Sequence, residues 1–254
     1  MRIEVKDVSM TYQAPEGEVE ALNGVSFDVE DGAFVSIVGP SGCGKSTLLS
    51  LLAGLERPTA GRILFDGAPL DPASRRIGLM PQRDQLFEWR TILRNVLLGP
   101  EIQGNNTPLC RRNAERLLEQ YALSGFADKP PSRLSGGMRQ RCALIRTLAI
   151  EPEVLLLDEP FSALDYQTRL AVSADISEII RRTKKTALLV THDIAEAISM
   201  SDQIVVLSRR PGHVRSIHAL TQLQGLGALQ RRESGMFQSL FHQIWGELNE
   251  DAGG

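Results

Sequence analysis

The feature that most constrains this chain is a short apolar run that leads directly into a glycine-rich turn. Phe34-Val35-Ser36-Ile37-Val38 has the composition of a buried parallel strand. It is followed by Gly39-Pro40-Ser41-Gly42-Cys43-Gly44-Lys45-Ser46-Thr47 and then by an apolar helical segment that stops at Gly54. A loop with this spacing between a strand and a helix predicts phosphate binding. Its glycines let backbone N–H groups turn inward, and the helix start adds a positive dipole end.

The side chains of this loop fit a nucleoside triphosphate that is bound together with Mg²⁺. We expect the Lys45 ammonium to reach the β- and γ-phosphates and the Ser46 hydroxyl to ligate Mg²⁺. We expect Cys43 to be a small spacer, although a helix N-terminus can lower the pKa of a thiol. The loop therefore predicts that the chain binds ATP and Mg²⁺.

A second part of the predicted site lies far along the chain, where an apolar strand ends in two carboxylates. Val154-Leu155-Leu156-Leu157 is followed by Asp158 and Glu159. Asp158 suits Mg²⁺ binding, and Glu159 is then free to orient or deprotonate the attacking water. An acid pair after a strand can also simply cap a turn, but the phosphate loop upstream favours the catalytic interpretation.

A second candidate phosphate-binding element lies between these two halves, in Leu134-Ser135-Gly136-Gly137-Met138-Arg139-Gln140-Arg141. Ser-Gly-Gly before a helix can be an ordinary N-cap, but it also offers a hydroxyl and bare N–H groups to an anion. One ATP needs only one cradle. The surplus element therefore suggests that Ser135, Gly136 and Gly137 serve the ATP of a partner chain.

Composition limits the class of protein. The chain has 254 residues, 42% of them hydrophobic and 23% charged, as in a soluble globular protein. Its net charge of −3 gives no strong attraction to nucleic acid, and we expect no nucleic-acid partner. The arginine pairs, among them Arg209-Arg210, are interpreted as solvated surface. No run approaches the roughly 18 apolar residues that cross a bilayer, and the charged Met1–Lys6 segment is not a signal peptide.

Short apolar runs alternate with helical patterns over most of the chain. Further strands are expected at 62–65, 77–80, 187–190 and 204–207, and helices at 111–121 and about 168–182. Residues 1–35 are expected to hold short strands. This alternation predicts an α/β fold with a mostly parallel sheet and helices on both faces.

Several motifs occur in one order along the chain, and together they resemble the nucleotide-binding domain of ATP-binding cassette (ABC) transporters. They are Tyr12, Gly39–Thr47, Gln82, Leu134–Arg141, Leu155–Glu159, Ser162-Ala163-Leu164-Asp165 and His192. The resemblance covers nearly the whole chain. It implies a P-loop NTPase (RecA-like) core, an N-terminal antiparallel β subdomain and a helical subdomain inserted at about 83–150. It also implies a single domain over 1–254, with a core of 1–82 and 151–215 and a helical tail at 216–254.

The resemblance also implies a head-to-tail homodimer with two ATP molecules between the subunits, in which residues 39–47 of one chain face Ser135–Gly137 of the other. In such a dimer Tyr12 stacks on adenine, Gln82 reaches Mg²⁺ and the water, Asp165 aligns the opposing phosphate loop and His192 contacts the γ-phosphate. Tyr12 can also be an ordinary strand aromatic, and a lone histidine is usually structural. The position of His192 directly after the apolar run at 188–190 favours the functional interpretation.

Two segments resemble the nitrate/sulfonate/taurine importer branch of the family: Trp89–Gly99 and Phe241–Leu248. The resemblance implies that residues of about 83–98 contact integral membrane permease subunits, with apolar contacts expected from Leu86, Phe87, Trp89 and Val96. Trp89 is equally compatible with a core position. Glu88 stands where that branch often has proline. The C-terminal pattern predicts an amphipathic helix that packs on the domain; its apolar members are Phe237, Leu240, Phe241, Ile244, Trp245 and Leu248.

The expected role is therefore the ATPase of an importer for a small solute, peripheral on the cytoplasmic face of the plasma membrane. A periplasmic or lipid-anchored solute-binding protein would take part indirectly. Two alternatives stay open at this point: a separate-subunit ABC exporter ATPase, and a soluble ABC ATPase that acts on DNA or the ribosome. The latter proteins generally carry two cassettes or long coiled-coil insertions. A P-loop kinase has no use for the Leu134–Arg141 element.

Overall fold

The computed structural model describes residues 1–15, 17–69, 76–105 and 107–250. Its centre is a six-stranded sheet with the strand order β10-β9-β3-β8-β7-β6. The five strands from β9 to β6 run parallel, and β10 joins the edge antiparallel to β9. The bounds are β3 Phe34–Val38, β6 Ile77–Met80, β7 Val154–Asp158, β8 Thr186–Thr191, β9 Gln203–Leu207 and β10 Val214–Ala219. The predicted α/β class with a mostly parallel sheet is confirmed.

The glycine-rich loop joins β3 to α1 (Lys45–Leu52), as the sequence predicts. All five residues of β3 are buried, because both faces of the sheet are covered at this strand: Val35 and Ile37 pack in a cluster with α1, and Phe34 and Val38 pack in clusters on the opposite face. Gly44 precedes the helix with a φ of 98°, which favours glycine. A Cβ at Gly44 would also lie 2.8 Å from the Ala21 carbonyl oxygen. The tight entry into α1 therefore depends on a residue without a side chain.

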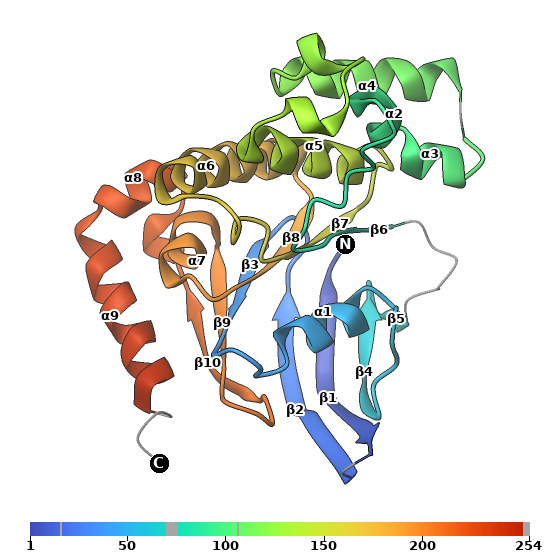
Figure 1. Ribbon diagram of the computed structural model, residues 1–254. Helices are drawn as coiled ribbons and strands as arrows, with labels where there is room; N and C mark the ends of the chain where they lie inside the picture. Colours follow the sequence, from blue (N-terminus) through green and yellow to red (C-terminus); the bar gives the residue numbers. More distant parts are fainter. Residues whose placement is uncertain (16, 70–75, 106, 251–254) are drawn as a thin grey trace.

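A second, antiparallel sheet covers the outer side of α1 (Figure 1), with the strand order β2-β1-β4-β5. Its strands are β1 Ile3–Ala14, β2 Gly17–Val29, β4 Ala60–Phe65 and β5 Ala68–Pro69. Strands β1 and β2 have 12 and 13 residues, so the expectation of short strands before residue 35 is wrong. Register shifts after Val5, Val8 and Met10 interrupt the alternating pattern, which makes one long strand look like several short ones.

Short and long helices form a separate layer above the parallel sheet (Figure 1), between the strands β6 and β7 in the sequence. These helices are α2 Ile92–Val96, α3 Leu98–Ile102, α4 Pro108–Gln120 and α5 Gly136–Leu148. The predicted helix at 111–121 is α4, which begins three residues earlier because the Thr107 hydroxyl caps it by accepting from the Cys110 N–H at 3.3 Å. Ala114, Leu118 and Tyr121 are buried on its inner face.

The remaining helices lie on the same side of the parallel sheet as α5, opposite α1 (Figure 1): α6 Tyr166–Thr183, α7 Ile194–Met200, α8 Ala228–Glu233 and α9 Gly235–Glu250. The predicted amphipathic tail helix is α9, and its Ile244 is fully buried in a cluster with Val38 and Ile194. Trp245, on its outer side, is 54% exposed. Within the described ranges no helix has the length and apolar character needed to cross a membrane.

Candidate functional site

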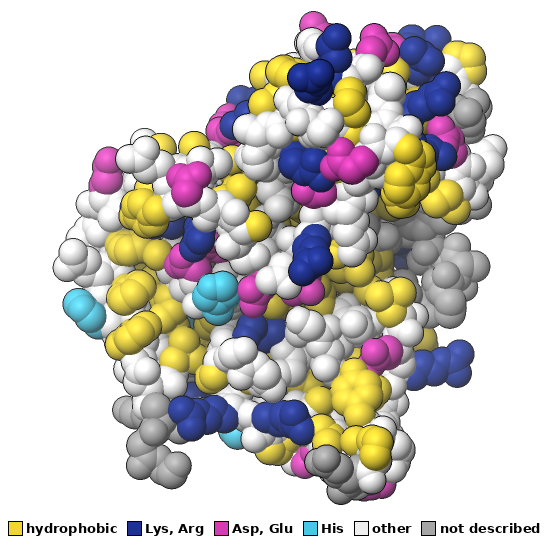
Figure 2. Space-filling model, in the orientation of Figure 1, with side chains coloured by type: hydrophobic (Ala, Val, Ile, Leu, Met, Phe, Trp, Pro, Cys, Tyr) yellow, Lys and Arg dark blue, Asp and Glu magenta, His cyan; other side chains and the backbone are white. Residues whose placement is uncertain are grey.

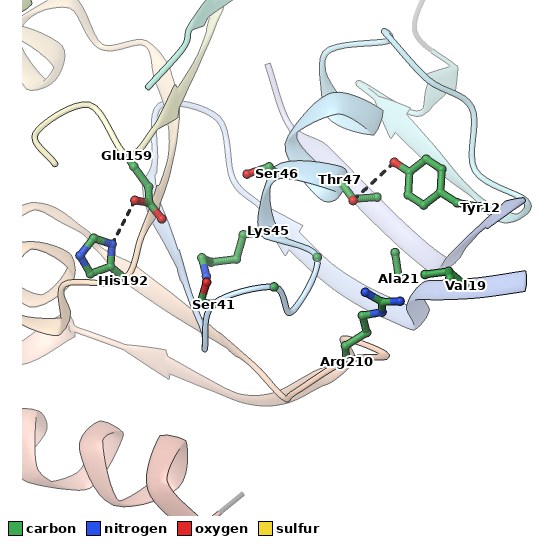
Figure 3. A pocket seen from close by; sticks show the side chains of 12 residues that line it. Tyr12, Val19, Ala21, Ser41, Lys45, Ser46, Thr47, Glu159, His192 and Arg210 are labelled. Carbon is green, nitrogen blue, oxygen red and sulfur yellow. Dashed lines mark hydrogen bonds and ion pairs between the residues drawn. The ribbon is translucent and has the colours of Figure 1, made fainter. Parts of the chain in front are cut away.

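A cavity of about 600 Å³ opens where strands β3, β7 and β8 end (Figure 3). Residues of both sheets and of the glycine-rich loop line it: Tyr12, Val19, Ala21, Ser41, Gly42, Gly44, Lys45, Ser46, Thr47, Glu159, His192 and Arg210. On the face shown in Figure 2, basic, acidic and histidine side chains gather near the middle, below the helical layer. Ligands of open parallel sheets bind at such carboxyl ends.

Lys45 is the buried cation of this cavity, with only 7% of its surface exposed. Its ammonium donates to the carbonyl oxygens of Gly39 and Pro40, both at 2.8 Å, and lies 3.8 Å from the Cys43 sulfur. Gly39, Pro40 and Cys43 thus support the lysine from behind and do not line the cavity. Burial raises the pKa of the Cys43 thiol, and the Lys45 charge lowers it only in part. The neutral, buried thiol fits the predicted spacer.

Ser46 and Asp158 meet beneath the loop, because α1 starts beside the end of β7. Burial, followed by the negative charge of Glu159, raises the pKa of the Asp158 carboxyl. A hydrogen bond from Ser46 and the charge of Lys45 act in the opposite direction. A hydroxyl and a carboxylate are hard oxygen donors, so this pair fits Mg²⁺, and phosphate oxygens would complete the coordination. When bound, Mg²⁺ would offset the charge of the phosphate oxygens.

Glu159 lies in the turn after β7 with a φ of 40°, in the left-handed region that non-glycine residues seldom adopt. Its backbone N–H donates to the Val190 carbonyl of β8 at 2.9 Å, which fixes the turn. Its carboxylate oxygen Oε2 lies 3.0 Å from His192 Nδ1 (Figure 3). A strained backbone that is held by a neighbouring strand is common where a side chain must be aimed at a ligand.

Gln82 follows β6, and its side chain approaches the Glu159 carboxylate from the end of that strand. Its Nε2 lies 3.5 Å from Glu159 Oε2 and 3.3 Å from the Ser162 hydroxyl oxygen. The structure therefore brings Gln82, Glu159 and His192 together, while Gln82 itself is outside the set of residues that line the cavity.

Tyr12 lies at the opposite end of the cavity from Glu159 and His192 (Figure 3). Its hydroxyl donates to Glu56 at 2.6 Å and lies 3.4 Å from the Thr47 hydroxyl. Burial raises the pKa of Tyr12, which keeps the phenol neutral. The aromatic ring stands on the same side as Val19 and Ala21, and the three together offer an apolar surface for a flat heterocycle.

Ser135, Gly136, Gly137 and Asp165 do not line this cavity. Ser135 caps α5 by accepting from the Met138 N–H at 3.4 Å, and Asp165 caps α6 by accepting from the Thr168 N–H at 3.1 Å. Ser135 and Gly136 are exposed. A Cβ at Gly137 would lie 3.0 Å from Val172 of α6, so close helix packing explains that glycine.

Three of the described lining residues could not be predicted from the sequence: Val19, Ala21 and Arg210. Val19 and Ala21 are small apolar residues of β2, and nothing in their sequence context distinguishes them from other strand residues. Arg210 belongs to the arginine pair that was interpreted as solvated surface. Its place at the cavity follows from the pairing of its loop with β2, which is a long-range contact.

The segment at 83–98 has one clearly exposed aromatic residue. Trp89 is 79% exposed, and its ring lies 4.7 Å from that of Phe87 between centroids. Leu86 and Val96 are only 6% and 0% exposed, and they belong to the core beneath the helices. The expectation that these two contact a partner is wrong, because their side chains are committed to intramolecular packing.

A family model described as ABC transporter matches residues 22–162, which is more than half of the chain. The chain belongs to the ABC transporter family. This ABC protein is 45% identical over 248 residues to the uncharacterized ABC transporter ATP-binding protein YtlC of Bacillus subtilis, covering 97% of the chain and 95% of that protein. It is 38% identical to the taurine import ATP-binding protein TauB of Jannaschia sp., over 85% of the chain and 81% of TauB.

Solved structures agree with this assignment. The dimeric structure of MJ0796, a bacterial ABC transporter cassette, superimposes with a TM-score of 0.74 at 33% identity, covering 86% of the chain and 98% of that cassette. The post-hydrolysis state of MJ0796 bound to ADP and Pi gives a TM-score of 0.73 at 34% identity over the same shares of the two chains. The chain is thus an ABC ATPase and the ATP-binding subunit of its system.

Proposed function

We propose that this chain is the ATP-hydrolysing subunit of an ABC importer, that it works as a head-to-tail homodimer, and that its system carries a small solute of the nitrate, sulfonate or taurine class. One observation carries the proposal. Lys45, Glu159 and His192 line one cavity with Asp158 directly beneath it, while the exposed start of α5 at Ser135 lies outside that cavity. The cavity of one chain therefore lacks the second phosphate-binding element that the same chain carries.

In the proposed chemistry, residues 39–47 bind the triphosphate. Lys45 exchanges its bonds to the Gly39 and Pro40 carbonyls for bonds to phosphate oxygens, so nucleotide binding also releases the loop backbone. Ser46 and Asp158 hold Mg²⁺ that arrives with ATP. Tyr12 stacks on adenine at the far end of the cavity.

Glu159 accepts a proton from, or orients, the water that attacks the γ-phosphate. The His192 imidazole now contacts the Glu159 carboxylate, and a bound γ-phosphate gives it a second acceptor. Gln82, which follows β6, contacts the Glu159 carboxylate and connects it to the segment at 83–98. Ser135, Gly136 and Gly137 of the second copy then close the site over the phosphates, and Asp165 aligns the opposing loop.

Import is supported by the taurine import ATP-binding proteins among the relatives and by the resemblance of Trp89–Gly99 and Phe241–Leu248 to that branch. We propose that the exposed Trp89 side of the 83–98 segment docks on a membrane permease subunit on the cytoplasmic face of the membrane. Stimulation of ATP hydrolysis by the solute-loaded binding protein, in the assembled complex, distinguishes an importer from an exporter.

The first prediction concerns Glu159→Gln. Because the amide cannot take the proton, steady-state ATP hydrolysis falls by on the order of 100-fold or more, while ATP binding persists. The ATP-bound dimer then accumulates and elutes as a dimer in size-exclusion chromatography with ATP. Glu178→Gln, on the exposed face of α6, is the matched control and behaves as wild type. Wild-type turnover in Glu159→Gln, with unchanged dimerisation, contradicts the assignment.

A further inference from the structure

The loop between β9 and β10 reaches back to the nucleotide cavity and is fixed there by backbone contacts. The Gly212 N–H donates to the Ala21 carbonyl, and the Gly212 carbonyl accepts from the Asn23 N–H, both at 2.9 Å. A Cβ at Gly212 would lie 2.1 Å from the Cys43 carbonyl oxygen, so the loop packs directly against the phosphate loop. Arg210 stands on this fixed loop two residues before Gly212.

The guanidinium of Arg210 faces the cavity beside Val19 and Ala21 (Figure 3). Among the residues that the structure describes, it has no hydrogen-bond or ion-pair partner. Of the described residues that line the cavity, only Glu159 is acidic, and it lies at the other end next to His192. A cation held near a cavity with its donors free is suited to an anionic part of the ligand.

The position of Arg210 along the cavity indicates which anionic part of ATP its guanidinium would contact. Tyr12 marks the adenine end, and Glu159 with His192 marks the γ-phosphate end (Figure 3). Arg210 lies on the Val19 and Ala21 side, between the Tyr12 ring and the loop residue Ser41. The groups of ATP between adenine and the β-phosphate are the ribose and the α-phosphate, and only the α-phosphate is charged.

We infer that Arg210 is a nucleotide-binding residue whose guanidinium contacts the α-phosphate of ATP. This inference rests on the proposed use of the cavity for the nucleotide. It adds a cation to the phosphate site from a part of the fold outside the family motifs in the sequence. Since ADP keeps the α-phosphate, Arg210 binds substrate and product alike and raises affinity without favouring the transition state.

The test compares dissociation constants of ATP, ADP and adenosine for purified full-length variants, measured by isothermal titration calorimetry at low salt. Arg210→Gln is expected to weaken ATP and ADP by a similar factor, about tenfold, because one charge-assisted contact is lost. Adenosine binding stays as in wild type, and Arg210→Lys regains part of the loss. Arg209→Gln is the matched control, since Arg209 does not line the cavity, and it binds all three ligands as wild type.

Lys45→Ala distinguishes a failure of the Arg210 contact from a failure of the proposed nucleotide site. If Lys45→Ala loses ATP affinity while Arg210→Gln matches Arg209→Gln, the Arg210 inference is overturned and the site stands. If Lys45→Ala binds ATP as wild type, the assignment of the cavity itself fails. A loss in Arg210→Gln that is equally large for adenosine places the contact on the nucleoside and overturns the α-phosphate assignment. A loss for ATP without one for ADP places it on the γ-phosphate, with the same consequence.

Discussion

Glu196, on α7, is a buried carboxyl that stands close to the candidate catalytic residues. It is 3% exposed, it accepts from the Thr191 hydroxyl at 2.8 Å, and its other oxygen lies 3.8 Å from Arg169 Nε. Burial, followed by the charge of Asp193, raises its pKa to about 7, although Thr191, Arg169 and His192 act in the opposite direction. Arg169 also donates to the Leu164 carbonyl at 3.0 Å, next to Asp165. This network joins the segment after His192 to the segment that precedes α6.

The raised pKa of Glu196 predicts that the free energy of unfolding depends on pH. The pKa of Glu196 is about 7 in the folded state and about 4.5 in the unfolded state, so the folded state binds the proton more tightly. The contribution of this group is therefore greatest below pH 4.5 and is lost as the pH rises to about 7. The loss amounts to on the order of 3 kcal/mol at about 1.4 kcal/mol per pKa unit.

Glu196→Gln should remove this loss. Its stability relative to wild type, from urea unfolding at several pH values, should rise between pH 4.5 and 7 and stay level above pH 7. Glu178→Gln, an exposed carboxyl on α6, should show no such rise. A stability difference between Glu196→Gln and wild type that does not change with pH would show that folding does not raise the pKa of Glu196.

Residues of the site were predictable wherever their position follows from a local pattern. Lys45, Ser46, Asp158, Glu159 and His192 each lie directly at the end of an apolar strand or the start of a helix, so their neighbourhood in the fold follows from the chain itself. Glu196 and Arg210 were not predictable in this way. Their environment depends on which loops and helices meet, and a single glutamate or an arginine pair carries no signal of that.

At the scale of elements, the buried parallel strands were the most predictable, because a short continuous run of apolar residues is typical of a strand that is buried on both faces of a sheet. β3, β7, β8 and β9 all match expectation. The strands β5 and β10 and the short helices α2, α3 and α8 were not predicted. The strand β5 and the three helices have only two to six residues, too few for a clear period to develop, and β10 lies at the edge of its sheet. The assignment of residue ranges to subdomains stays a prediction.

The segment before α2 gives an element-scale prediction. Trp89 is 79% exposed and its ring lies against that of Phe87 at an interplanar angle of 37°, whereas Leu86 is buried in the core, so the segment presents one aromatic surface on a fixed base. Trp89→Ala should reduce the amount of permease subunit that copurifies with the chain from membranes, because it removes the large aromatic surface that would be buried at the proposed interface. Unchanged thermal unfolding of the isolated subunit would show that the fold is intact.

The control for this variant is Trp245→Ala on α9, where the tryptophan is 54% exposed on a different face. Along the left edge of Figure 2, where α9 runs, hydrophobic side chains are visible at the surface. Trp245→Ala should retain the permease. If both substitutions reduce copurification equally, or if neither does, the 83–98 segment is not the specific contact.

At the scale of the whole molecule, the chain carries two separate surfaces that can bind phosphate. One is the cavity at Lys45, which residues of both sheets and of the glycine-rich loop line. The other is the exposed N-terminus of the 13-residue helix α5 at Ser135, which does not line that cavity in the same chain. Neither surface can complete the other within one molecule. In the proposed head-to-tail homodimer, each surface would lie against the one that it lacks in its own chain.

This arrangement predicts how two inactive variants complement each other. Ser135→Arg places a bulky cation where the partner's ATP must fit, and Lys45→Ala removes the ammonium that binds the phosphates, so each variant alone should lose ATP hydrolysis. A mixed dimer holds one site in which Lys45 of the first variant faces Ser135 of the second. Mixing equal amounts should therefore restore hydrolysis, limited to one complete site per mixed dimer. The double variant Lys45→Ala, Ser135→Arg, mixed with Lys45→Ala, forms no complete site and should restore nothing. Full hydrolysis by isolated monomers would rule out the shared site, because a monomer never brings Ser135 to its own phosphate loop.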